Sequence, residues 1–183
     1  MKIDLENFTR IVWLLPVVFM LHEFEEILFF RQWLHKNKVF LSQKYPKVST
    51  FLLVRVGHLS TEGFVLAVAE EFVLLSVVTV LSVVFDCYWL WLGVFMGFSV
   101  HLLVHLLQWI AFRRYIPGIY TTLLALVYSV WAFRFIVLYD LFTWKEIILC
   151  TIIGFAAVVL NLLLAHKLAA LFDGKRRQTK IKE

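Results

Sequence analysis

Residues 64–85, FVLAVAEEFVLLSVVTVLSVVF, decide the fold of this chain. A helix that crosses the hydrocarbon core of a bilayer needs about 20 mostly apolar residues, because each residue adds about 1.5 Å. This stretch has that length, and Glu70 and Glu71 are its only charged residues. It therefore predicts a transmembrane helix that carries two carboxyl groups.

Four other stretches share this character, at residues 11–30, 88–112, 119–138 and 146–168. Over the whole chain 62% of the residues are apolar and 17% are charged, whereas soluble domains average about 45–50% and about 25%. No linker separates two cores. The sequence therefore predicts one membrane domain over residues 1–183, an all-α bundle of about five transmembrane helices.

The basic residues gather in alternate connections between these stretches. The connection 31–63 holds six Lys or Arg, the turn 113–118 holds two and the tail after residue 170 holds five, whereas the connections 86–87 and 139–145 together hold one. Cytoplasmic loops carry such an excess, so we expect the N-terminus outside and the C-terminus, with its basic tail 173–183, inside. Because a membrane accounts for the net charge of +5, we expect membrane lipids as partners and no nucleic acid.

The connection 31–63 is not expected to be a simple loop. Its apolar part, residues 51–56, follows Ser49 and Thr50, which are typical of helix N-termini. This part is either an interfacial helix or an early start of the second span. At the other end of the chain, the Asp-Gly pair at 173–174 is expected to end the last helix.

Several ionisable side chains lie inside the predicted spans. Each such group costs about 2.5–3.5 kcal/mol at the centre of a membrane helix. At about 1.5 Å per residue, groups from three spans reach one layer in the cytoplasmic half of the membrane. These residues are His22, Glu25 and Glu26 in the first span, Glu70 and Glu71 in the second, and His101 and His105 in the third.

Helical spacing places these groups on shared faces. His22, Glu25 and Glu26 follow an i, i+3, i+4 pattern and share one face, whereas Glu23 points elsewhere. The two histidines of the third span are four residues apart and also share a face. The adjacent glutamates of the second span diverge by about 100°, so only one of them is expected to reach the other groups.

Histidine and glutamate at helical spacing are the ligands of metal sites inside helix bundles, where they hold zinc or iron. Several ionised carboxylates in one dry layer need cations or protons to neutralise them, which favours two ions over one. A hydrogen-bond network between the helices is the alternative. The expected ligands of the transition metal, iron or zinc, are His22, Glu25, Glu26, Glu70, Glu71, His101 and His105.

Other polar residues are expected outside the ligand set. His58, Asn161 and His166 are expected at the membrane interface or beside the site. Cys87 and Cys150 are expected to be free thiols in an apolar environment, with a disulfide between them as the alternative.

At residues 22–26, HEFEE, the sequence resembles the HXXEE-domain family of small bacterial membrane proteins. The pair His101 and His105 on a later apolar helix is also consistent with that family. The resemblance covers essentially the whole chain. It implies a metal-dependent enzyme in the bacterial cytoplasmic membrane, and it implies no particular reaction.

The leading hypothesis is a metal-dependent enzyme that acts on a lipid or another apolar small molecule entering from the bilayer. The number of carboxylates narrowly favours iron and oxidative chemistry, with Glu25 and Glu71 as the catalytic groups. In the alternative, a zinc hydrolase, His22, His101 and His105 bind the ion and a glutamate activates water. A further alternative is an ion or proton transporter, since buried Glu and His also carry ions through membranes.

Overall fold

The computed structural model of the chain describes the backbone of residues 2–55, 57 and 59–182, and the side chains of residues 6–53, 57 and 59–175. Within these residues the chain forms six α-helices and no strand. The predicted all-α fold is therefore confirmed. The helices are α1 (Lys2–Lys44), α2 (Pro46–Arg55), α3 (Thr61–Val84), α4 (Tyr88–Phe112), α5 (Ile119–Leu138) and α6 (Trp144–Lys182).

Among the described residues, four helices are long and apolar enough to cross a membrane: α3, α4, α5 and the part Trp144–Lys175 of α6. The remaining expected span, residues 11–30, lies within α1, which is more polar because its middle carries three glutamates. Large apolar side chains on the helix surfaces, such as Leu124 and Leu160, are 72% and 68% exposed. Lipid can cover such side chains, and the helices therefore indicate a membrane protein.

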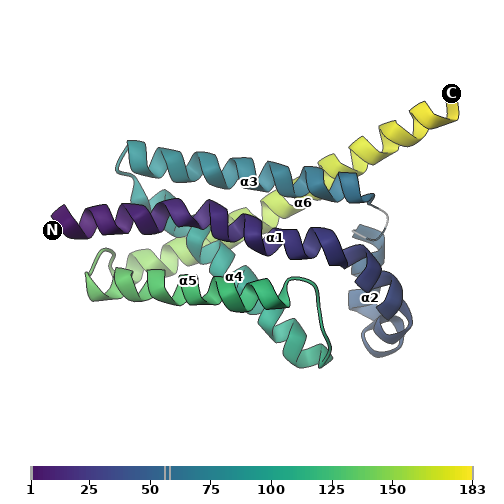
Figure 1. Cartoon of the computed structure of the whole chain (residues 1–183), viewed down its shortest axis with the longest axis horizontal. Helices are drawn as coiled ribbons and strands as arrows, with labels where there is room; N and C mark the ends of the chain where they lie inside the picture. The colour runs from purple at the N-terminus through teal and green to yellow at the C-terminus, as the bar shows by residue number, and fades with distance from the viewer. Residues whose placement is uncertain (1, 56, 58, 183) are drawn as a thin grey trace.

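The long helices alternate in direction along the long axis of the molecule (Figure 1). The start of α1 and the turns after α3 and α5 lie at one end, whereas α2 and the turn 113–118 lie at the other. The first end holds Asp86 and Asp140, and the second holds the basic residues of α2 and of the turn 113–118. The two sets of connections that were expected on opposite membrane faces thus lie at opposite ends of the bundle.

Helix α1 is longer than the expected span, which was predicted to end at Arg31 and Gln32. No proline or glycine interrupts the chain between these residues and Lys44, so the helix continues. Pro46 then begins α2, because the residue before a proline is disfavoured in a helix. Helix α2 is separate from α3, so this segment is not an early start of the second span.

The expected end of the last helix at residues 173–174 is wrong, because α6 continues to Lys182. Asp173 is buried, and its carboxylate accepts a hydrogen bond of 2.6 Å from the backbone N–H of Ser60, just before α3. A carboxylate at a helix N-terminus satisfies donors that the helix itself cannot. Asp173 therefore ties α6 to the start of α3 and does not end its own helix.

Helices α4 and α6 cross in close backbone contact at Gly93, Gly97 and Gly154. A Cβ atom added at Gly154 would lie 1.9 Å from the carbonyl oxygen of Gly93, and one added at Gly97 would lie 3.0 Å from the carbonyl oxygen of Gly154. Glycines four residues apart allow this approach of membrane helices. The crossing holds α4, the helix of His101 and His105, against the rest of the bundle.

Candidate metal centre

Four side chains from α1 and α4 converge in the interior of the bundle. They are His22 and Glu26 of α1 and His101 and His105 of α4, and their ligand atoms all lie within 4.8 Å of one another. The Nε2 atom of His101 lies 3.2 Å from that of His22 and 3.1 Å from that of His105. Oε1 of Glu26 lies 2.8 Å from Nε2 of His105. Helical spacing explains the set, since each helix contributes two residues four positions apart.

The donor set fits a transition metal. Three imidazole nitrogens and one carboxylate oxygen are the ligand types that zinc takes in proteins. With bonds of about 2.0–2.1 Å, the ligands of a tetrahedral zinc ion lie about 3.3 Å apart, close to the two Nε2–Nε2 separations. Three imidazoles without an ion must each find a donor or acceptor among themselves, whereas an ion accepts a lone pair from every Nε2 atom.

The turn 113–118 closes over this group at Gly118. Its φ of +86° lies in the left-handed region, where glycine carries no steric penalty. A Cβ atom here would lie 3.1 Å from Cε1 of His22 and 3.1 Å from Oε1 of Glu26. Glycine thus allows the backbone before α5 to pack directly on two of the four side chains.

Thr121 of α5 forms a hydrogen bond with the ring of His22. Oγ1 of Thr121 lies 3.3 Å from Nδ1 of His22, and it donates a hydrogen bond of 2.7 Å to Oε2 of Glu25. When Nε2 of His22 offers its lone pair to an ion, Nδ1 carries the proton and donates it to Thr121. Such outer hydrogen bonds fix the tautomer and the ring orientation of a metal-binding histidine.

Glu25 lies beside the four-residue group, which does not include it. Its carboxylate accepts hydrogen bonds from the backbone N–H of Thr121 at 2.8 Å and from Tyr115 Oη at 2.9 Å. An anion near the first turn of α5 is favourable, because the N–H groups there have no partner within the helix. Burial, together with the hydrogen bond to Glu25, raises the pKa of Tyr115, which therefore remains a donor.

We expect Thr121→Val to weaken metal binding about 10- to 100-fold, the usual effect of losing the hydrogen bond that orients a metal-binding histidine. Metal titration of the purified protein measures this change. Thr122→Val is the matched control, because Thr122 is buried and its Oγ1 has no hydrogen-bond partner. Equal affinities of the two variants would contradict the role given to Thr121.

The two glutamates of α3 have different neighbours. Glu70 accepts a hydrogen bond of 3.1 Å from Asn161 Nδ2 of α6. Glu71 lines a cavity of about 120 Å³ together with His101 and the buried Glu23, which the spacing argument had placed away from the site. Neither α3 glutamate is in the four-residue group, and Glu71 shares a cavity with one of its members.

We therefore expect Glu71→Ala to lower metal affinity more than Glu70→Ala does. The reason is that Glu71 lines the same cavity as His101, whereas Glu70 faces Asn161. Metal titration of both variants tests this order. A larger loss of metal affinity in the Glu70 variant would contradict the expectation that Glu71 is the α3 glutamate that affects the metal centre.

The remaining expectations concern residues outside this set. Asn161 borders the Glu71 cavity, and His166 is half-buried and not in the four-residue group. His58 lies outside the described residues. Both cysteines are free thiols, as expected.

Spacing could not identify Thr121, Tyr115 or Gly118 as part of the centre. The sequence holds one hint, the proline and glycine at 117–118, which predict a turn between two spans. The helix that follows such a turn starts at the same end of the bundle at which the preceding helix ends. The turn thereby places an α5 threonine against an α1 histidine, and this contact depends on tertiary packing.

No curated protein and no solved structure matches the chain. Residues 13–132 match the family described as protein of unknown function with HXXEE motif. The matched part contains all four converging side chains and the turn that packs on them. The chain belongs to this HXXEE family.

Proposed function

We propose that this protein is a metal-dependent membrane enzyme with a single ion held by His22, His101, His105 and Glu26. The observation that supports the proposal is the approach of three imidazole nitrogens and one carboxylate oxygen to within 4.8 Å of one another inside the bundle. The cost of placing polar groups in a membrane makes such a cluster a functional feature.

One ion fits better than the two favoured by the carboxylate count. Among the residues whose side chains are described, one group of converging ligands forms, and it contains one glutamate. The other glutamates of the motif and of α3 have separate neighbours. Three imidazoles with one carboxylate are a donor set that zinc takes, and because zinc has no redox chemistry, we assign hydrolysis rather than oxidation.

An ion held there would act as a Lewis acid and lower the pKa of water at the site. Glu26 faces both His105 and a larger cavity of about 390 Å³, which reaches towards α2. A molecule in that cavity therefore lies beside the proposed site of the ion. Thr121 holds the His22 ring and is itself held by Glu25, and apolar side chains form most of the cavity wall.

Metal analysis of the purified protein tests the proposal. We expect about one equivalent of zinc per chain, because one group of four ligands is present. One equivalent of iron would move the assignment to oxidative chemistry. Protein that binds neither ion when titrated would reduce the cluster to a hydrogen-bond network between helices.

We also propose that the bundle lies in a bacterial cytoplasmic membrane with its N-terminus outside. The basic residues of α2 and of the turn 113–118 support this orientation, since cytoplasmic loops attract such residues. Reporter fusions after Lys47 and after Lys175 should both give a cytoplasmic signal. An external signal from either fusion would refute the orientation, and with it the assignment of the centre to the cytoplasmic half.

A further inference from the structure

The larger cavity beside the metal centre has an apolar wall and a small number of polar groups. Its volume of about 390 Å³ is within the range of about 300–1,000 Å³ usual for small-molecule sites. Glu26 and His105 border it on the side of the metal centre. The apolar wall includes Phe30, Trp33, Phe51, Leu52, Phe112 and Ile116.

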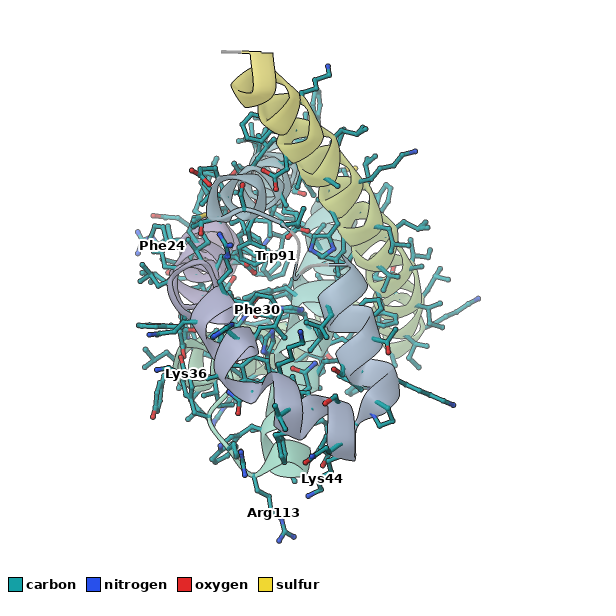
Figure 2. All side chains as sticks on the ribbon, turned by 90° about the vertical axis from the view of Figure 1, so that its right-hand side faces the viewer. Phe24, Phe30, Lys36, Lys44, Trp91 and Arg113 are labelled. Atoms are coloured by element: carbon teal, nitrogen blue, oxygen red, sulfur yellow. The ribbon has the colours of Figure 1, made fainter. Side chains whose placement is uncertain are left out.

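The cavity extends from the metal centre towards the basic end of the bundle. Along α1 its wall runs from Glu26 to Trp33, which corresponds to about 10 Å at the helical rise. Figure 2 looks from that end: Phe30 lies inside the bundle, whereas Lys36 and Arg113 point away from it. A molecule in the cavity can therefore reach the centre with one end and the basic end with the other.

Lys47 is the basic side chain in the wall, contributed by α2. It is exposed, so it stays in contact with water while it borders the apolar space. The other polar group away from the metal centre is Gln108, which is uncharged. The charge of the wall thus changes from a carboxylate at the metal centre to an ammonium on α2.

Helix α2 offers a route into this cavity from the membrane. Val48 and Phe51 line the cavity and are also 39% and 52% exposed on the molecular surface. Such exposed apolar side chains next to Lys47 are typical of a helix that lies at the membrane interface. The cavity is therefore open to the molecular surface at apolar side chains of α2.

We infer that the cavity takes, as the substrate of the metal centre, a single-chain anionic amphiphile with an ester or amide bond at the end of its chain that lies away from the anionic group. The part of this inference that calls the molecule a substrate rests on the proposed function. The anionic group lies at Lys47, and the chain follows Phe30 and Trp33 to His105. The bond that reacts is therefore separated from the anionic group by apolar chain.

Photolabelling tests the inference. The probe is tetradecanoic acid with a diazirine in the middle of its chain, added to the full-length protein in nanodiscs of phosphatidylcholine. We expect labels on the cavity walls in residues 26–33 and 47–52, and competition by unlabelled tetradecanoate but not by tetradecanol. Lys47→Gln should lower this labelling about fivefold, the effect of losing one partly solvated ion pair worth about 1 kcal/mol.

Two variants provide the controls. Lys38→Gln removes an exposed charge of α1 that does not border the cavity, and it should leave the labelling unchanged. Leu52→Trp should reduce labelling by filling the space. Equal labelling of the Lys47 and Lys38 variants, equal competition by the alcohol, or labels confined to other surfaces would each overturn the inference.

Metal analysis of the same samples separates this inference from the proposed function. Lys47 is outside the ligand group, so both lysine variants should keep their metal. Cavity labelling that depends on Lys47 in a protein that binds no metal would support the binding site and refute the enzyme. Full metal content without cavity labelling would refute the substrate class alone.

Discussion

Replacing His101 by alanine should remove metal binding almost entirely. His101 lies between the other two histidines, with its Nε2 atom 3.2 Å from that of His22 and 3.1 Å from that of His105. Loss of an outer hydrogen bond costs about 10- to 100-fold in metal affinity, so loss of a ligand should cost more than about 100-fold. His22→Ala should have a similar effect, and metal titration of the purified variants measures both.

His35→Ala is the control for this experiment. His35 is also on α1, but it is exposed and not in the ligand group, so its variant should bind metal as the wild type does. Full metal retention by either the His22 or the His101 variant would contradict the metal centre. A chelator should also lower the melting temperature of the wild type and of the His35 variant, because an ion that binds the folded state stabilises it.

Helix types and positions could be predicted because the apolar stretches are long. Residues 64–85, 88–112 and 119–138 agree with α3, α4 and α5 within a few residues, since turns with proline, glycine or aspartate separate them. The ends of α1 and α6 were harder to predict. Both helices continue into polar sequence, where hydropathy gives no sign of whether a helix stops.

The convergence of these side chains could be predicted in part because helical spacing restricts which side chains share a face. His22, Glu26, His101 and His105 all come from pairs spaced i, i+4, and these four converge. Glu25, three residues after His22, was also expected on this face, yet its carboxylate lies against Tyr115 of the neighbouring turn and Thr121 of α5.

The depth of a residue in the membrane predicted its neighbours less well than its angular position on the helix did. The argument from depth brought the second span towards the site, and Glu71 does share a cavity with His101. The same argument could not show that Glu23 lines that cavity, because the packing of α1 against its neighbours decides what faces Glu23. The partners of a buried carboxylate are set by tertiary contacts, and the spacing of residues within one helix does not predict these contacts.

The crossing of α4 and α6 was also outside the reach of the sequence argument. Gly93 and Gly97 are four residues apart, but no sequence pattern links them to the distant Gly154, which meets them at one point. This contact is relevant to the metal centre because His101 follows Gly97 by about one helical turn. A change in the crossing should therefore shift the α4 ligands.

Replacing Gly154 by leucine should lower the melting temperature in detergent by about 5–10 °C. The reason is steric, because the first side-chain carbon alone would lie 1.9 Å from the carbonyl oxygen of Gly93. Overpacking of this kind costs about 1–3 kcal/mol, and 1 kcal/mol corresponds to about 2–4 °C for a chain of this size. Metal affinity should fall in the same variant, because the α4 backbone must move away from α6.

Gly174→Leu is the matched control for the crossing, since it makes the same substitution on the same helix. A Cβ atom at Gly174 meets no atom within 4 Å, so nothing has to shift. Leucine also favours a helix by about 1 kcal/mol relative to glycine, and the variant should be at least as stable as the wild type. If the Gly154 variant melted at the same temperature as the Gly174 variant, α4 and α6 would not be in backbone contact. The positions of His101 and His105 would then need another support.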